Sequence, residues 1–150
     1  MSIRKRTAED FPAIVPLLEA VHLPSQGLER TEGWVLEQAG QILGHVAIEL
    51  TPDAAVIRSL VVGAASQGQG LGRQLLDAAE AHSGPRTLVL KTGTIGPWVE
   101  RRGYIPATLG QVPASVLATT QFEGTLCSGY PLFMKAPGKD SPLTAQSTSR

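Results

Sequence analysis

The chain has 150 residues, 42% of them hydrophobic, which is enough for one small domain around a single core. Its 13 basic and 13 acidic residues cancel, and only 5% of the residues are aromatic. Because nucleic-acid-binding and membrane-surface proteins usually carry a positive field, and single-strand binders carry stacking aromatics, we expect neither nucleic acid nor a membrane as a partner.

Hydrophobic periodicity predicts a strand, a helix and then a meander of three strands in residues 1–62. Thr7 is a candidate N-cap, and the acidic residues Glu9 and Asp10 suit the first turn of the helix that follows. Pro16 is expected to bend or interrupt this helix. The apolar residues expected to face inward from it are Phe11, Ile14, Val15, Leu18 and Val21. Strands are expected at 3–6, 34–38, 42–50 and 55–62, with a tight hairpin at 39–41.

The second half of the chain alternates helices and strands. A helix is expected from Leu71 to about His82, where Gly84 and Pro85 end it. The other expected elements are a strand at 87–91, a short helix at 96–101, a strand beginning at 103–105, a short helix at 112–119 and a last strand at 130–135. This order predicts a mixed α/β fold with a central sheet of about six to seven strands flanked by helices. We expect one domain over residues 1–136 and a disordered tail at 137–150, where little can be buried.

Cysteine usage and the apolar pattern predict a cytoplasmic location. The single cysteine, Cys127, allows no internal disulfide, and we expect it to be a packed, inert thiol. The basic residues 1–6 are not followed by an apolar run, and no stretch approaches the roughly 20 apolar residues of a membrane span. No cluster of histidines, cysteines and carboxylates has the spacing of a metal site, so we expect no metal.

The most informative segment is a buried strand followed by a glycine-rich turn that opens a helix. The residues of the turn are Gln67, Gly68, Gln69, Gly70, Leu71 and Gly72. The helix after it carries Leu71, Leu75 and Ala79 along one face. At a helix N-terminus the backbone N–H groups point outward and the helix dipole adds partial positive charge. The segment therefore predicts a site for a phosphate or pyrophosphate.

Two common phosphate loops do not fit this turn. A Walker loop ends in Gly-Lys-Ser/Thr, whereas Gly72 is followed by Arg73 and Gln74. The dinucleotide fingerprint needs Gly-x-Gly-x-x-Gly at the first βα turn, which is neither this spacing nor this place in the chain. The turn does match Gln/Arg-x-x-Gly-x-Gly/Ala, preceded by Leu60-x-Val62 at the end of the strand. In this it resembles the pyrophosphate loop of the GNAT acyl-CoA N-acetyltransferases.

The resemblance to this superfamily extends from about Ser2 to Ala136. Residues 98–104 look like the family's late signature, in which aromatic residues flank a glycine. A narrower resemblance is to the amino-acid N-acetyltransferases of arsenic-resistance operons, which in turn resemble the acetyltransferase domains of N-acetylglutamate synthases. It rests on residues 23–28, 58–60, 112–114 and 122–134.

The resemblance implies acetyl-CoA as co-substrate, no metal, and direct transfer of the acetyl group to the primary amine of a small molecule, an amino acid or analogue, in a ternary complex. It implies that the Val62 backbone N–H stabilises the oxyanion. The residues implied to bind acetyl-CoA are Leu60, Val61, Val62, Gln67, Gly68, Gln69, Gly70, Leu71, Gly72 and Arg73. Two alternatives are open: a non-catalytic acyl-CoA-binding or regulatory domain, and a protein N-terminal or lysine acetyltransferase. A homodimer is open as well.

Two positions depart from the family pattern. Many relatives carry a carboxylate base where this chain has Arg58, and a tyrosine acid where it has Val99. Three possibilities are therefore open: the proton leaves through water, the amine binds already neutral, or turnover is slow or lost. For Arg58 itself two interpretations stand: an internal ion pair with Glu49 or Asp53, or a fork that binds the carboxylate of the substrate.

Overall fold

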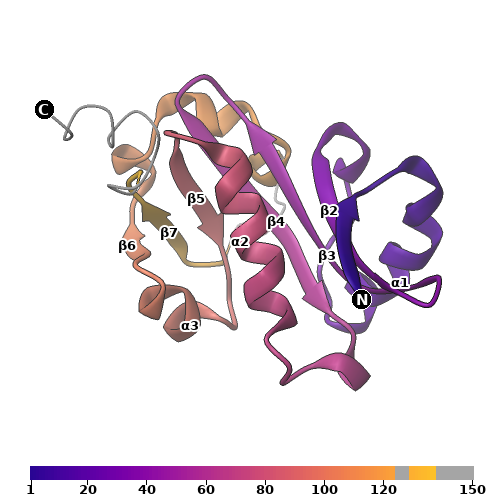
Figure 1. The fold of residues 1–150 in the computed structure, drawn as a ribbon. Coiled ribbons are helices and arrows are strands. Elements are labelled where there is room, and N and C mark those ends of the chain that lie inside the picture. The colour runs from indigo at the N-terminus through magenta and orange to yellow at the C-terminus, as the bar shows by residue number, and fades with distance from the viewer. Residues whose placement is uncertain (124–128, 138–150) are drawn as a thin grey trace, which may run out of the picture. The chain divides into compact units, whose positions relative to one another are not determined.

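The computed structural model describes residues 1–123 and 129–137 (Figure 1). In this part of the chain the strands are β1 (Ser2–Lys5), β2 (Glu32–Gln38), β3 (Gln41–Leu50), β4 (Ala54–Val62), β5 (Thr87–Lys91), β6 (Ile105–Ala107) and β7 (Leu132–Lys135). The helices are α1 (Phe11–Ala20), α2 (Leu71–Ser83) and α3 (Gly96–Arg101). The strands form one sheet in the order β1-β2-β3-β4-β5-β7-β6. The expected mixed α/β fold with six to seven strands is confirmed.

The chain divides into two compact units, each with its own core. The first unit holds residues 1–49 and 57–81, and the second holds residues 50–56 and those from 82 onward. The core of the first unit consists of Ile14, Leu18, Leu28, Val35, Ala47 and Val61. The core of the second consists of Ala54, Val56, Val89, Val112, Val116 and Leu132.

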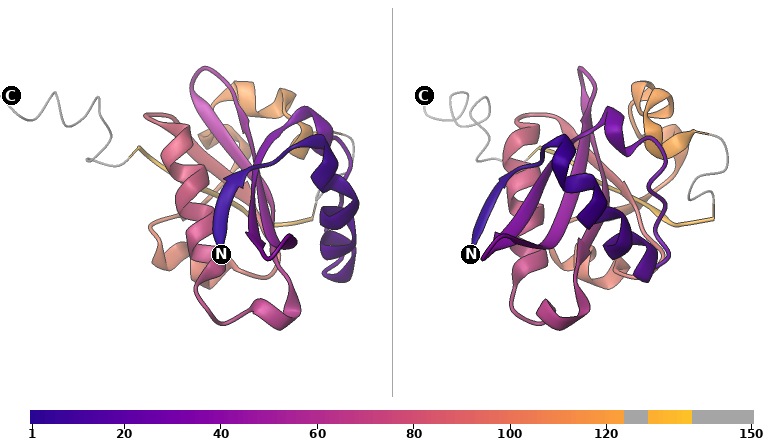
Figure 2. Two further views of the ribbon diagram at one scale, coloured as in Figure 1. Left: turned by 45° about the vertical axis from the view of Figure 1, so that its right-hand side comes forward. Right: turned by 90° about the vertical axis from the view of Figure 1, so that its right-hand side faces the viewer.

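Within the first unit, α1 and α2 lie on opposite faces of the strands (Figure 2). The expected inner face of α2 is confirmed, because Leu71, Leu75 and Ala79 are buried. In α1 the buried residues are Ile14 and Leu18, whereas Val21 is 43% exposed, so its expected inward position is wrong. The helix has ended at Ala20, and Val21 is already its C-cap.

Pro16 does not interrupt α1, which runs through it to Ala20. A proline inside a helix removes the N–H that would bond to the carbonyl four residues earlier. That carbonyl belongs to Pro12, and both prolines are exposed. Water can therefore bond to the Pro12 carbonyl, which makes the missing donor tolerable.

The connection between β2 and β3 is shorter than the three residues expected. Gln38 pairs with Gln41, so only Ala39 and Gly40 connect the strands. Their φ angles are +52° and +78°. Two successive left-handed residues are typical of the type I′ turn, whose twist matches that of antiparallel strands. The expected hairpin is confirmed.

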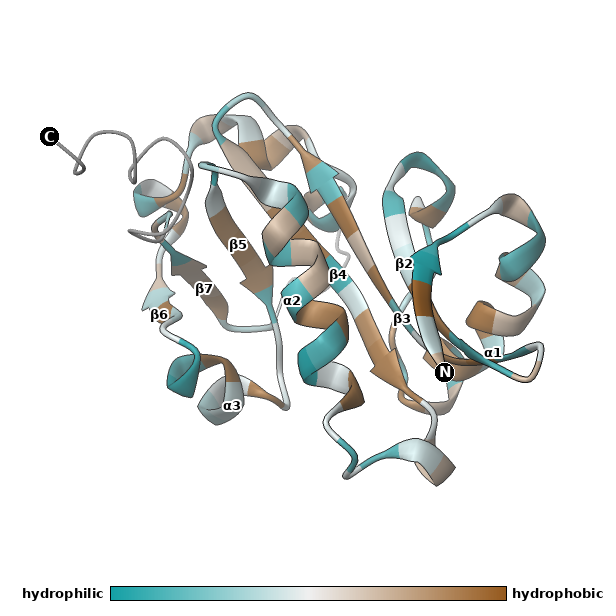
Figure 3. Ribbon diagram, in the orientation of Figure 1, coloured by the Kyte–Doolittle hydropathy of each residue, from teal (hydrophilic) through white to brown (hydrophobic). Residues whose placement is uncertain are grey.

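In the second unit, β5 and α3 have the expected bounds, and β7 pairs antiparallel with both β5 and β6. Strands β5 and β7 are largely hydrophobic along their length (Figure 3). The helix expected at 112–119 is a shorter 3-10 turn, Ala114–Ala118. The Thr119 hydroxyl donates to the Val116 carbonyl at 2.6 Å, and this local bond competes with the α-helical pattern.

Some expectations fall on residues outside the described ranges, namely the thiol of Cys127 and the tail at residues 138–150. Among the helices of residues 1–123 and 129–137, none combines the length and the apolar character needed to cross a membrane. The same residues contain no group of three or more histidines, cysteines and carboxylates that could hold a metal ion.

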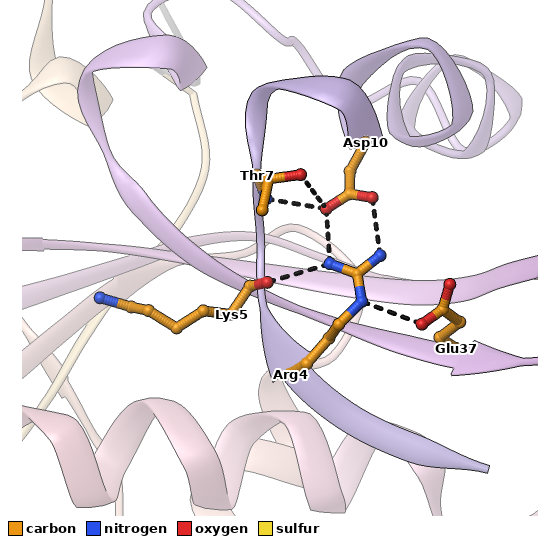
Figure 4. A network of polar contacts seen from close by, with 5 residues as sticks. All are labelled: Arg4, Lys5, Thr7, Asp10 and Glu37. Carbon is orange, nitrogen blue, oxygen red and sulfur yellow. Dashed lines mark hydrogen bonds and ion pairs between the residues drawn. The ribbon is translucent and has the colours of Figure 1, made fainter. Parts of the chain in front are cut away.

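A charged network fixes the corner between β1 and α1 (Figure 4). Arg4 donates from Nη1 and Nη2 to the two Asp10 carboxylate oxygens, at 2.9 and 2.8 Å, and from Nε to Glu37 at 2.9 Å. The Thr7 N–H also donates to Asp10, at 2.8 Å. Thr7 is thus the expected N-cap, of a 3-10 turn (Ala8–Asp10) that leads into α1. The hydrogen bonds from Arg4 hold the pKa of Asp10 at about 2, below its usual value of 3.8.

We predict that Asp10→Asn lowers the free energy of unfolding by about 1–3 kcal/mol at about pH 7, because a charge-assisted bidentate contact is lost. Since the pKa of Asp10 is lowered by folding, its contribution is complete above pH 3.8 and is lost as the pH falls through about 2. Urea unfolding of wild type and variant should therefore differ at about pH 7 and converge near pH 2.

The control is Glu9→Gln, in the same turn but exposed, which should change stability by less than about 0.5 kcal/mol. Equal losses in the two variants, or an Asp10→Asn loss that does not depend on pH, would contradict the role given to Asp10.

Candidate functional site

The candidate site lies in the first unit, where β4 ends and α2 begins. After Val62 the chain makes a 3-10 turn, Ala64–Ser66, and then the glycine-rich turn (Figure 1). Residues 67–70 are exposed, and Leu71 is buried as the first residue of α2. The apolar face of α2 thus anchors the helix and leaves the turn in solvent, where a large anionic ligand can reach it.

The glycines of the turn adopt a backbone that other residues rarely take. Gly68 has φ +85° and Gly70 has φ +76°. The Gly70 carbonyl accepts a hydrogen bond from the Gln74 N–H at 3.2 Å, which places Gly70 at the start of the helical hydrogen-bond pattern. The N–H groups of the first helical turn therefore point toward the glycines, as an anion site requires.

Arg73 adds a full positive charge to the same place. Its side chain is exposed, and its Nη2 lies 3.5 Å from the position that a Cβ on Gly70 would occupy. The guanidinium thus leans over the turn beside the positive end of the α2 dipole. Of the residues predicted from the sequence, the structure exposes Gln67 to Gly70 and Arg73 together, whereas Leu71 is buried and anchors α2.

The end of β4 presents backbone groups on its edge away from β3. The Gly63 N–H donates to the Leu43 carbonyl of β3 at 2.8 Å. Since backbone groups alternate sides along a strand, the N–H and C=O of Val62 point to the opposite edge. There the Val62 carbonyl accepts a hydrogen bond from Gln67 Nε2 at 3.0 Å. The Val61 side chain is buried in the core, which holds this part of β4 in place.

Ser59, just before Leu60, breaks the regular course of β4. Its φ is +58°, in the left-handed region. Its carbonyl contacts His45 Nδ1 at 2.9 Å, and its hydroxyl accepts a hydrogen bond from Arg58 Nε at 3.0 Å. The sequence contains no local signal for this irregularity, because strand β4 is rich in residues that favour extended backbone.

Arg58 is buried, with 4% of its surface exposed, and it bonds to the segment between α1 and β2. Its Nη1 donates to the Gln26 carbonyl at 2.8 Å and its Nη2 to the Pro24 carbonyl at 3.2 Å. Arg58 therefore ties β4 to that segment. Asp53, one of the partners considered for it, accepts a hydrogen bond from Ser115 at 2.6 Å in the second unit.

The position of the family's tyrosine acid is occupied by Val99, which is fully buried in α3 of the second unit. An aliphatic side chain cannot transfer a proton. At the two positions where the sequence resemblance implies an acid and a base, this chain thus has a buried valine and a buried arginine, Arg58.

Solved structures provide a comparison for the fold. One is N-acetylglutamate synthase from Neisseria gonorrhoeae complexed with coenzyme A and L-arginine, with a TM-score of 0.72, 22% identity and coverage of 91% of this chain and 33% of that chain. The present chain thus spans about a third of that synthase chain. Rv2747 from Mycobacterium tuberculosis, in a complex with CoA, has a TM-score of 0.71, 17% identity and coverage of 91% and 99%. An acyl-CoA N-acyltransferase from Pseudomonas aeruginosa has a TM-score of 0.62, 19% identity and coverage of 90% and 100%.

At these identities the similarities show a shared fold. The family is shown by the sequence, because residues 29–106 match the model described as "Acetyltransferase (GNAT) domain". The match covers more than half of the chain and includes β4, the glycine-rich turn and α2. This chain therefore belongs to the GNAT acetyltransferase family.

Proposed function

We propose that the chain transfers an acetyl group from acetyl-CoA directly to the primary amine of a small molecule, an amino acid or a close analogue. The observation that carries the proposal is the exposed glycine-rich turn, set between the outward edge of β4 at Val62 and the N-terminus of α2. A dianionic pyrophosphate suits the turn, and an amide-bearing chain suits the strand edge.

The coenzyme is proposed to bind along two features of the first unit. Its pyrophosphate would accept hydrogen bonds from the backbone of residues 67–72, with Arg73 as the nearby cation. Its pantetheine arm would pair with the backbone of residues 60–62 like an added strand. An amide of the arm would then take the place of Gln67 Nε2 at the Val62 carbonyl.

The chemistry requires few side chains, because the thioester is already activated. The amine nitrogen attacks the thioester carbonyl carbon, the developing oxyanion accepts a hydrogen bond from the Val62 N–H, and the C–S bond breaks to release the CoA thiolate. The amine loses its proton to water, and the thiolate takes one from water. Holding the two reactants together can supply about 7–11 kcal/mol of the barrier, so transfer does not need a side-chain acid or base.

The choice of an amino acid as acceptor rests on three lines of support. The narrower sequence resemblance is to amino-acid N-acetyltransferases. The synthase with a similar fold was solved with L-arginine and, in another structure, with N-acetyl-glutamate. In this chain Arg58 lies on β4 next to Ser59, and it bonds to the Gln26 carbonyl of the segment between α1 and β2.

We predict that Gly70→Glu weakens binding of acetyl-CoA by at least about 100-fold while the protein stays folded, because a charged side chain then occupies the pyrophosphate position. Isothermal calorimetry with acetyl-CoA measures the effect. The matched control is Gly40→Glu, since Gly40 has φ +78° against +76° for Gly70 and no atom lies within 4 Å of its Cβ position.

Both variants place glutamate on a left-handed residue, so both lose similar stability. Only Gly70→Glu should lose affinity. Affinities that match between the two folded variants would reject the pyrophosphate site. Wild type that binds acetyl-CoA but releases no CoA thiol with any amine of a broad panel would instead favour a non-catalytic acyl-CoA-binding domain, and release only with peptides would favour protein acetylation.

We predict that wild type has a higher kcat/KM for amino acids than for the corresponding decarboxylated amines. Arg58→Lys should reduce this preference by about tenfold, because lysine keeps the charge but loses the planar fork. Release of CoA thiol with matched pairs of substrates measures it. The control is Arg86→Lys, because Arg86 also donates to two backbone carbonyls, those of Thr51 and Ser83.

Arg86→Lys should lower thermal stability much as Arg58→Lys does and leave the preference unchanged. Wild type with equal activity on both members of each pair would reject the amino-acid acceptor. An unchanged preference in Arg58→Lys would assign Arg58 to the support of Pro24 and Gln26 alone.

A further inference from the structure

The left-handed conformation of Ser59 must be maintained by its surroundings. A non-glycine residue in this region is strained and persists only where its neighbours hold it. Ser59 directly precedes the segment 60–62 proposed to pair with pantetheine, so its φ and ψ set the direction in which that segment runs. The contact of its carbonyl with His45 Nδ1, at 2.9 Å, comes from the neighbouring strand β3.

The partners of His45 determine which of its ring nitrogens carries the proton. Arg6 Nη1 lies 2.9 Å from His45 Nε2. A guanidinium has donors only, so Nε2 must accept this hydrogen bond. The proton of the neutral imidazole is therefore on Nδ1, from which it is donated to the Ser59 carbonyl. His45 is completely buried, and burial together with the charges of Arg6 and Arg58 lowers its pKa to about 3, so the ring stays neutral.

Arg6 is itself held on several sides. Its Nη2 donates to the Leu28 carbonyl at 3.2 Å, to the Thr31 carbonyl, and to Thr31 Oγ1 at 3.2 Å. The Phe11 ring lies over the guanidinium, 4.8 Å from its Cζ. On the sheet side the guanidinium lies against Gly33, where a Cβ would come within 2.6 Å of Nη1. Arg6 can therefore act as a fixed donor to His45.

We propose that Arg6 and His45 are positioning residues for the coenzyme. The hydrogen bonds from Arg6 to His45 and from His45 to the Ser59 carbonyl fix the irregular point of β4, and thereby the orientation of the Val62 N–H. This inference rests on the proposed function, because it assumes that β4 binds the thioester arm. Without Arg6, Nε2 no longer has a donor, and the imidazole can carry its proton there and release the Ser59 carbonyl.

The test is Arg6→Met, which keeps an apolar stem beneath Phe11 and removes the donors. Its matched control is Arg4→Met, two residues earlier in β1, because Arg4 bonds to the side chains of Asp10 and Glu37, not to His45. We expect Arg6→Met to weaken CoA binding about tenfold and to lower kcat, with the KM for the amine changed less than about threefold. Arg4→Met should lower thermal stability and leave all three quantities within about twofold.

Equal CoA affinities in Arg6→Met and Arg4→Met would overturn the proposal and leave the proposed function standing. Wild type that fails to bind CoA would overturn both. A general loss of stability would affect the two variants alike, so a loss of CoA affinity confined to Arg6→Met supports positioning.

A spectroscopic measurement on wild type tests the same network without any substitution. It is the deciding test in the case that Arg6→Met does not fold. In ¹⁵N NMR of histidine-labelled protein, His45 should carry its proton on Nδ1 throughout about pH 5–8, and the signal is assigned by its loss in His45→Phe. Saturation with CoA should shift the Nδ1 resonance and slow exchange of its proton. A proton found on Nε2, or an Nδ1 resonance unmoved by saturating CoA, would overturn the proposal.

Discussion

The first unit depends on satisfying the buried polar groups around one irregular residue of β4. β4 is buried on both faces from Ala54 to Ser59, so Arg58 and Ser59 are both buried, at 4% and 9% exposure. A buried donor or acceptor without a partner costs about 1–3 kcal/mol, so each must find one. Arg58 finds carbonyls at Pro24 and Gln26, and Ser59 finds His45. The bonds of the buried Arg58 thus hold the segment before β2 against the sheet.

Two arginines hold that segment at its two ends through backbone carbonyls. Arg58 bonds near its start, at Pro24 and Gln26, and Arg6 bonds near its end, at Leu28 and Thr31. Burial lowers the pKa of Arg6, and the charge of Asp10 opposes this effect. Backbone carbonyls are suited to such sites, because they accept charge-assisted hydrogen bonds from the guanidinium and are themselves uncharged.

Structural features that depend on neighbouring residues could be predicted from the sequence, whereas contacts between residues far apart in the chain could not. The bounds of β5 and α3, the hairpin after β2 and the exposed glycine-rich turn follow from local patterns, and the structure has them. The outward position of Val21 was missed, because the apolar period continues one residue beyond the end of the helix. The contacts among Arg6, His45 and Ser59 join residues 39 and 14 positions apart. No local pattern encodes them, since an isolated histidine or arginine in a sequence is compatible with many partners.

In the proposed mechanism, backbone groups rather than side chains bind the coenzyme and stabilise the oxyanion. In this member of the GNAT family, the groups proposed to bind the coenzyme are N–H and C=O groups of β4, of the glycine-rich turn and of the first turn of α2. Backbone groups are the same in every residue, so the sequence marks only the glycines that shape the turn. What makes one strand edge able to bind a thioester is then the set of side chains that hold its backbone in an otherwise unfavourable conformation. His45 is buried and lies on β3, and the partly buried Arg6 follows β1, so neither lies in the turn that identifies the family.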